Sequence, residues 1–401
     1  MIKILQGNCI DKIKELDDNS IDCVVSSPPY FGLRDYGTAT WKGGNPNCEH
    51  KKSRFNYSIS DKQKSNNGSS GLGAYKSGEF CKCGAKRIDE QFGLEKTYQD
   101  YLTNTVKVFE TFKPKLKDTA TIWWNVGDSY SNHKDCKSIG QTLAKGTTRE
   151  KAHEIEKGKS HTRDSKLLKA SGLKDKDLMM IPNRVAIALQ DAGWYIRSEI
   201  IWHKPNPMPE SVRDRPTSCH EKIWLITKNK KYYYDAESIK EPIQDSSAKR
   251  LLQKNILNQK GSSRANGGMK SNGNMKAVWN RKKFEEYMGS SGSSFKGHSG
   301  YKKADGTYMI NTTRNKRNVW TITTKPFKDA HFATFPKDLI EPCIKAGCPE
   351  GGIVLDPFGG SGTTGIVAAL NNRNAILIEL NQNYIDIANK RIDKEVGLFN
   401  G

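Results

Sequence analysis

The chain has 401 residues, with 65 Lys and Arg against 44 Asp and Glu, and a formal net charge of +21. This length allows two or three structural units, or one large domain with an insertion. No run of about 18 apolar residues occurs, and the start lacks the apolar stretch of a signal peptide, so we expect a soluble, cytoplasmic protein. The excess positive charge favours a polyanionic partner, above all nucleic acid.

The first segment alternates strand and helix. We predict a strand at 3–6, a helix at 11–16 and a buried strand at 21–26, which ends at Ser27-Pro28-Pro29-Tyr30. Prolines have no N–H, so this turn offers carbonyl acceptors, and Ser27 adds a hydroxyl; both suit an amine donor. Tyr30 offers a flat face on which a base could stack. Taken alone, the motif is equally typical of a proline turn with an exposed tyrosine.

From residue 42 to 78 the sequence is rich in Gly, Asn, Ser and Lys, which predicts an exposed excursion within an inserted loop spanning 42–96. Two pairs of metal-ligand residues bracket it. Three thiolates and one imidazole make a complete tetrahedral zinc set, although each pair has one intervening residue where zinc knuckles usually have two to four. Structural zinc and four unrelated exposed side chains both remain open for Cys48, His50, Cys81 and Cys83.

Helical and strand-like segments continue to alternate up to residue 227. A polar, lysine-rich stretch at 131–177 interrupts them and is predicted to be a mobile loop over the surface. We predict helices at 98–112 and 178–192, and strands at 120–126, 194–202 and 222–227, the last two being neighbours.

The segment from 241 to 318 concentrates positive charge, with 16 Lys and Arg against 5 Asp and Glu. Six aromatic side chains are interleaved with its cations, a mixture suited to phosphate contact and base reading. The alternative is a solvated linker.

The C-terminal segment is predicted to form a βαβα unit, typical of a parallel sheet covered by helices. A glycine-rich turn, from Asp356 to Thr364, follows its first strand and opens its first helix, so that the backbone can approach a nucleoside closely. The turn has no Lys, which argues against an ATP or GTP loop. Glu379, at the end of the second strand, is placed to accept hydrogen bonds from ribose hydroxyls.

Together, Ser27-Pro28-Pro29-Tyr30 and Asp356-Pro357-Phe358-Gly359-Gly360-Ser361-Gly362 resemble the motifs of the amino-methylating DNA methyltransferases. The catalytic motif precedes the cofactor motif, as in the circularly permuted β class of that family. The resemblance implies a mostly parallel, doubly wound α/β sheet (Rossmann-like) with an inserted target recognition region. It also implies S-adenosylmethionine as cofactor and double-stranded DNA as substrate, with base flipping.

Carried over residue by residue, the family pattern gives a catalytic set and a cofactor set. His331 to Pro336 resembles the methionine-side cofactor motif, and Asn8 stands where the family commonly has an Asp near the cofactor adenine. The catalytic set is Ser27, Pro28, Pro29 and Tyr30; the cofactor set is Asn8, Phe332, Ala333, Asp356, Pro357, Phe358, Gly360, Ser361, Gly362, Thr363 and Glu379.

The resemblance also predicts an organisation: a catalytic half at 1–234, a target recognition region at 235–318 and a cofactor-binding half at 319–401. Serine before Pro-Pro is more often found with cytosine N4 than with adenine N6, so N4 is the favoured target and N6 the alternative. Enzymes that methylate RNA or protein amines place the two motifs in the opposite order, and a non-catalytic DNA-binding protein would not need both. A homodimer and a companion restriction endonuclease are left open.

Overall fold

The structure is a computed structural model that describes residues 1–32, 38–50, 80–89, 91–131, 172–244, 246, 313–324 and 335–397. Its contacts divide the chain into two compact units, Met1–Tyr234 with Asn318–Gly401, and Asp235–Arg317. The first unit contains both sequence motifs. Most of the predicted recognition region, and most of the predicted loop at 131–177, lie outside the described residues.

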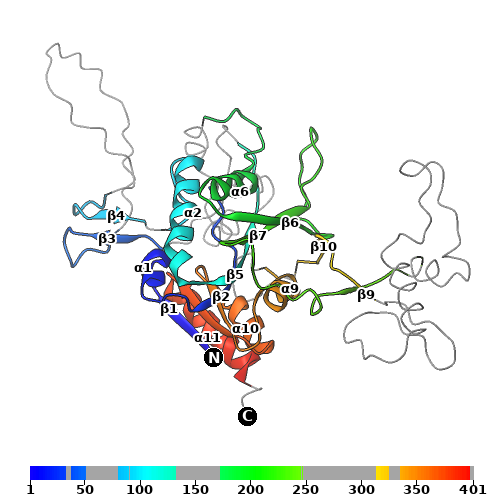
Figure 1. Cartoon of the computed structure of the whole chain (residues 1–401). Helices are drawn as coiled ribbons and strands as arrows, with labels where there is room; N and C mark the ends of the chain where they lie inside the picture. The colour runs from blue at the N-terminus through cyan, green and yellow to red at the C-terminus, as the bar shows by residue number, and fades with distance from the viewer. Residues whose placement is uncertain are drawn as a thin grey trace, which may run out of the picture. The chain divides into compact units, whose positions relative to one another are not determined.

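The first unit is built on one eight-stranded sheet with the order β1-β12-β11-β2-β5-β7-β6-β10 (Figure 1). All neighbouring pairs are parallel except the two that involve β7, which runs antiparallel to β5 and β6. The predicted α/β fold with a mostly parallel sheet is therefore confirmed. The strands are β1 (Ile2–Gln6), β2 (Ile21–Ser26), β5 (Leu116–Val126), β6 (Tyr195–His203), β7 (His220–Thr227), β10 (Val319–Thr321), β11 (Ile353–Asp356) and β12 (Asn374–Glu379).

Helices cover both faces of this sheet, and strand β5 shows why. Ile122 and Trp124 point into the core shared with α2, whereas Thr121 and Trp123 point to Gly347 at the end of α9. Alternate residues of a strand face opposite sides, so a strand that is buried on both faces needs two helical layers. The helices are α1 (Cys9–Lys14), α2 (Tyr98–Phe112), α6 (Ile181–Asp191), α9 (Lys337–Gly347), α10 (Thr363–Leu370) and α11 (Gln382–Glu395), with a 3₁₀ turn, η1, at Lys113–Lys115.

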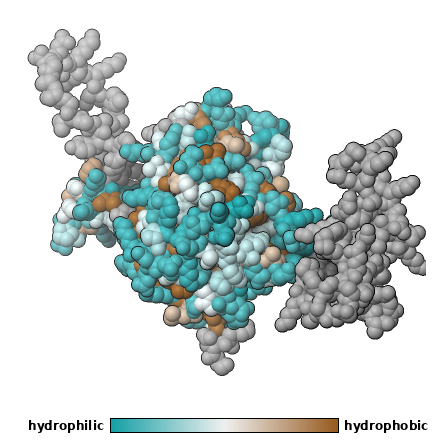
Figure 2. Space-filling model, viewed as in Figure 1, coloured by the Kyte–Doolittle hydropathy of each residue, from teal (hydrophilic) through white to brown (hydrophobic). Residues whose placement is uncertain are grey.

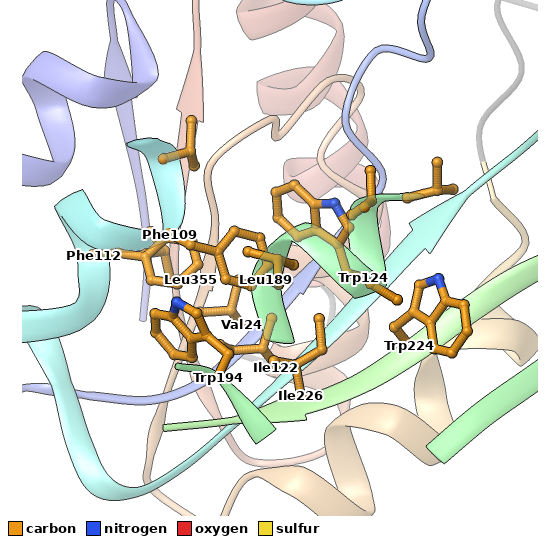
Figure 3. Close-up of a cluster of buried hydrophobic side chains, with 14 of the residues drawn as sticks. Val24, Phe109, Phe112, Ile122, Trp124, Leu189, Trp194, Trp224, Ile226 and Leu355 are labelled. Atoms are coloured by element: carbon orange, nitrogen blue, oxygen red, sulfur yellow. The ribbon is translucent and has the colours of Figure 1, made fainter. Parts of the chain in front are cut away.

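The core on the α2 face is rich in aromatic side chains (Figure 3). The Phe109 ring lies edge-on to Trp124, with centroids 4.9 Å apart, and edge-on to Trp194 at 5.3 Å. Such edge-to-face pairs add to the hydrophobic gain from burial. The core therefore fixes α2 against β5, the strand whose carboxyl end reaches the site described below.

Most predicted elements are confirmed within a few residues, and the differences have local causes. The helix predicted from 178 begins instead at Ile181, because Leu178 bridges to Tyr130 and Met180 has a left-handed backbone (φ +58°). The strand predicted at 120–126 extends back to Leu116. Helix α9 and strand β10 were not among the predicted elements.

Two small antiparallel sheets complete the described structure. In the first unit, β3 (Thr40–Lys42) pairs with β4 (Lys86–Ile88). The predicted inserted loop at 42–96 therefore contains β4 and begins at the end of β3. The sequence did not predict that these two strands pair. In the second unit, β8 (Glu241–Pro242) pairs with β9 (Thr313–Arg314).

The face of the described chain seen in Figure 2 is mostly hydrophilic, with scattered hydrophobic residues. Among the helices in the described ranges, none is both long enough and apolar enough to span a lipid bilayer.

Candidate active site

The site lies where four neighbouring parallel strands end. Strands β12, β11, β2 and β5 are adjacent and parallel, so their carboxyl ends meet at one edge of the sheet. Open α/β sheets bind ligands outside this edge. The glycine-rich turn leaves β11 here and Ser27-Pro28-Pro29-Tyr30 leaves β2, so the fold brings together two motifs more than 300 residues apart in sequence.

A hydrogen bond links the residue before the proline motif to the first residue of the glycine turn. Ser26 Oγ, at the last position of β2, donates to Asp356 Oδ1 across 2.6 Å. The same carboxylate accepts from Phe358 N (3.0 Å) and from Thr364 Oγ1 (2.6 Å), and only 1% of Asp356 is exposed. Burial raises the pKa of Asp356, while these three hydrogen bonds lower it. Asp356 therefore shapes the turn and ties it to the catalytic loop.

Arg391 of helix α11 stabilises the rest of the turn. Arg391 Nη1 donates to the Ser361 carbonyl (2.7 Å), to Ser361 Oγ (2.8 Å) and to Thr363 Oγ1 (3.0 Å). Gly360 and Gly362 have left-handed backbones, with φ of +50° and +80°. Glycine adopts this conformation without steric cost, so the turn can be tight.

Phe358 presents an aromatic ring at the junction of the two motifs. Its centroid lies 5.2 Å from Phe92, which precedes α2, and 6.1 Å from Trp124 of β5. Phe358 is partly exposed, whereas Pro357 is buried. Of these two predicted cofactor residues, only Phe358 can offer a surface to a ligand.

Glu379 and Asn8 stand side by side on the cofactor side of the site. Glu379 accepts from Gly360 N (2.9 Å) and Asn381 N (2.8 Å), and burial raises its pKa. Its backbone carbonyl accepts from Gly7 N. Asn8 caps helix α1 by accepting from Ile10 N at 3.0 Å. Each side-chain oxygen has two lone pairs, so both residues can accept a further hydrogen bond.

The hydroxyl of Tyr30 lies at the centre of a polar cluster. It donates to Glu221 Oε2 at 2.7 Å and accepts from Asn125 Nδ2 at 2.8 Å and from Ser27 Oγ at 3.2 Å. Asn125 Nδ2 also donates to Glu221 Oε2 (3.1 Å), and a carboxylate can only accept, which fixes the orientation of the amide. Lys204 forms an ion pair with the other oxygen of Glu221. Burial, and next the nearby Glu221, raise the pKa of Tyr30 well above its ordinary value, so it stays protonated.

The Tyr30 ring rests against Gly127. A Cβ atom at Gly127 would lie 2.5 Å from the ring, closer than real contacts allow. Gly127 follows β5 immediately, so the strand end that carries Asn125 also sets the position of the tyrosine.

The proline carbonyls of the motif have different surroundings. The Pro29 carbonyl accepts from Tyr101 Oη of α2 at 3.2 Å. Among the described residues, no hydrogen bond uses the Pro28 carbonyl. Asn125 Oδ1 is likewise buried with no partner within the described part of the chain. The Pro28 carbonyl is thus an acceptor with no partner in the described structure, and Asn125 Oδ1 is a buried, unsatisfied acceptor on β5.

The structure brings most of the predicted site residues to one edge of the sheet, but Phe332 and Ala333 lie outside the described residues. Sequence reasoning did not single out Asn125, Glu221 or Lys204. Asn125 carried a signal, because it is a polar residue directly after the apolar run Ile122–Trp124. The four predicted metal ligands also come together, away from this edge.

Comparison with known proteins gives the family. A family model described as DNA methylase (N6_N4_Mtase) matches residues 21–390. The Type II methyltransferase M.SmaI of Serratia marcescens is 34% identical over 97% of this chain and 90% of its own length. The Type II methyltransferase M.Cfr9I of Citrobacter freundii is 32% identical over 98% of this chain and 88% of its own.

Among solved structures, PvuII DNA methyltransferase (cytosine-N4-specific) matches with 16% identity and a TM-score of 0.46, covering 100% of this chain and 91% of that one. The family model and the two relatives each span nearly the whole chain, and both motifs fall within their matches. The chain belongs to the DNA methylase family.

Proposed function

We propose that this chain is a β-class DNA methyltransferase that transfers a methyl group from S-adenosylmethionine to the exocyclic amine of a flipped base in double-stranded DNA. The observation that carries the proposal is the hydrogen bond between Ser26 and Asp356, which fastens the catalytic loop to the glycine turn. Family membership supports the reaction type.

The residues around the glycine turn fit a nucleoside cofactor. Glu379 is partly exposed at the end of β12 and keeps lone pairs for ribose hydroxyls, while Asn8 keeps one for an adenine amine. The partly exposed Phe358 ring and Gly360 border the same edge. S-adenosylmethionine supplies a methyl group already activated by its sulfonium, so the protein has mainly to position and stabilise.

The polar cluster suits an amine target. Flipping a base out of a duplex costs a few kcal/mol, which stacking on Tyr30 would partly offset. The Pro28 carbonyl and Ser27 Oγ can accept the amine hydrogens, turning the nitrogen lone pair away from ring conjugation and toward the methyl group. We assign Asn125 and Glu221 to positioning, because both hydrogen-bond the Tyr30 hydroxyl. No covalent cysteine intermediate is needed.

Cytosine N4 is the proposed target atom, and adenine N6 is the alternative. The preference rests on Ser27, since serine before Pro-Pro is the form more often found with cytosine in this family. We further propose that residues 235–318 contain the target recognition region, on the strength of their concentrated positive charge and interleaved aromatics.

The test is to incubate the purified protein with unmethylated duplex DNA and isotopically labelled S-adenosylmethionine, digest the DNA to nucleosides and identify labelled species by mass spectrometry. Labelled N4-methylcytosine is the expected product. Labelled N6-methyladenine would be consistent with a DNA methyltransferase but would show that adenine N6, and not cytosine N4, is the target atom. No labelled nucleoside, from protein that binds the cofactor, would reject DNA as the substrate and direct the assay to RNA and protein amines.

A further inference from the structure

Four metal-ligand side chains meet beside the paired strands β3 and β4, which precede α2 in the chain. Their donor atoms all lie within 4.8 Å of one another. Two belong to the segment after β3 and two to the segment before β4. The four residues are Cys48, His50, Cys81 and Cys83.

The spacing of these atoms matches a tetrahedral site. Cys48 Sγ and Cys81 Sγ are 3.8 Å apart, and Cys83 Sγ lies 3.2 Å from His50 Nδ1. Two sulfurs bound to one zinc at about 2.3 Å in tetrahedral geometry stand about 3.8 Å apart. A disulfide is excluded for the Cys48–Cys81 pair, since bonded sulfurs are only about 2.05 Å apart.

The backbone around Cys83 is shaped to surround its sulfur. Cys81 N donates to the Ala85 carbonyl at 2.8 Å, which closes the turn that carries Cys83. Gly84 turns the chain with φ of +87°, and its N–H donates to the Cys81 carbonyl at 2.9 Å. A Cβ at Gly44 would lie 2.8 Å from Cys83 Sγ, so the opposite strand approaches too closely for any other residue.

The hairpin is short. Each strand has three residues, and a two-stranded hairpin alone is at best marginally stable in water. Small folded segments that lack a core of their own are commonly stabilised by a disulfide or a structural metal. Three thiols and an imidazole converge at the loop end of this strand pair, where a bound ion would stabilise it.

We propose that Cys48, His50, Cys81 and Cys83 bind one structural Zn²⁺ ion. Thiolate and imidazole ligands select zinc over magnesium or calcium. Four protein ligands leave no open coordination position for water or substrate, so the ion is structural and takes no part in methyl transfer. Despite the single intervening residue within each pair, the four ligand atoms lie within 4.8 Å of one another.

The ion would stabilise a segment that supports the catalytic loop. The segment that contains the hairpin begins after Gly32, at the end of the catalytic loop, and ends at Gly93. Gly32 N donates to the Gly93 carbonyl at 2.8 Å, so the two ends of the segment are held together. A Cβ at Gly93 would lie 3.0 Å from the carbonyl oxygens of Pro29 and Tyr30. Loss of zinc should therefore loosen one support of the loop.

The experiment measures metal content of the purified full-length protein, prepared without a histidine tag or chelator, by inductively coupled plasma mass spectrometry. We expect about one zinc per chain, and cobalt exchanged into the site should give the intense visible bands of a tetrahedral thiolate complex. Cys81→Ser and Cys83→Ser should lose most of the zinc, whereas the matched control Cys219→Ser, outside the hairpin, should keep it.

Two variants of His50 distinguish the loss of a zinc ligand from misfolding. His50→Cys preserves a complete four-thiolate set and should retain zinc, while His50→Ala should bind it more weakly in a competition with a chromogenic chelator. Wild-type protein that contains no zinc and gives no tetrahedral cobalt spectrum after reconstitution would overturn the proposal. So would undiminished zinc in folded Cys81→Ser and Cys83→Ser proteins, as judged by circular dichroism.

Discussion

The glycine turn and the catalytic loop lie side by side, but they use their polar groups differently. In the turn, the Asp356 carboxylate is buried and accepts three hydrogen bonds from its own surroundings. In the loop, the Tyr30 hydroxyl joins Asn125 and Glu221 in a partly exposed cluster. The side chain of Asp356 therefore shapes the backbone of the turn. The Pro28 carbonyl of the loop has no hydrogen-bond partner among the described residues, and the Tyr30 hydroxyl of the same loop stays protonated.

This difference suggests a division of labour. Changes in the turn should act first on folding and cofactor affinity, because they remove the hydrogen bonds that shape its backbone. Changes in the polar cluster should act on the methyl-transfer step at saturating cofactor, because they move groups around the target amine. Cofactor affinity and the single-turnover rate of methyl transfer measure these two effects separately.

The largest effect is expected for Asp356→Ala. Removing the carboxylate leaves two hydroxyls and one N–H without their buried acceptor, at about 1–3 kcal/mol for each unsatisfied group. We expect a clearly lower melting temperature and no measurable cofactor binding by isothermal titration calorimetry. Asp386→Ala, an exposed change on α11, serves as the control and should leave both unchanged. Unaltered cofactor affinity in Asp356→Ala would contradict the role given to the turn.

Gly127→Ala should come next, and it should affect only the loop side. The added methyl would occupy space filled by the Tyr30 ring, and a displacement of about 1 Å at a reacting centre can cost about 10²-fold in rate. We expect that loss in single-turnover methyl transfer, with cofactor affinity retained. Gly397→Ala, where the new methyl meets nothing within 4 Å, is the matched control. A wild-type rate in Gly127→Ala would show that the contact between Gly127 and the Tyr30 ring does not affect methyl transfer.

Glu221→Gln tests the charge within the cluster. The substitution keeps the shape but leaves Lys204 without its anionic partner and weakens the hydrogen bond from Tyr30, a loss of about 1.5 kcal/mol for a bond to a charged group. We expect about a tenfold slower single-turnover rate. Glu210→Gln, which breaks a surface pair with Arg215, should transfer methyl groups at the wild-type rate. Equal rates in both variants would show that the cluster does not act on the reaction.

The smallest effect concerns Asn8. Asn8→Ala removes a helix cap and should cost about 1 kcal/mol of folding stability. Asn8→Asp keeps the cap and restores the acid that the family commonly has there. It should preserve the melting temperature and tighten cofactor binding, as measured by calorimetry. If Asn8→Asp binds the cofactor no better than wild type, Asn8 acts as a cap alone.

Much of this arrangement could be predicted from the sequence. The buried strand at Ile21–Ser26 and the helix at Tyr98–Phe112 were predicted with the boundaries observed, because each has a clear apolar pattern and a defined end. Each motif was predicted to follow a strand, and the structure shows that these two strands, β2 and β11, are parallel neighbours.

The remaining features depend on contacts that are distant in sequence. Glu221 lies on an antiparallel strand, and its approach to Tyr30 follows from the pairing of β5 with β7, which the local pattern does not encode. Asp356 stays a predicted cofactor residue, and the pattern did not reveal the three hydrogen bonds through which its carboxylate shapes the turn. Sequence patterns identify which residues matter more readily than which partner each one contacts.

The most direct test of the division of labour measures two quantities on two variants. Cofactor affinity by calorimetry and single-turnover methyl transfer at saturating cofactor are determined for Glu379→Gln and for Tyr30→Ala, beside wild type. Glu379→Gln should weaken cofactor binding about 10-fold or more and largely keep the transfer rate, since it loses a charged hydrogen-bond acceptor. Tyr30→Ala should bind the cofactor normally and lose methyl transfer. If both variants lose affinity and rate together, the two motifs form one functional unit and the proposed division of labour is wrong.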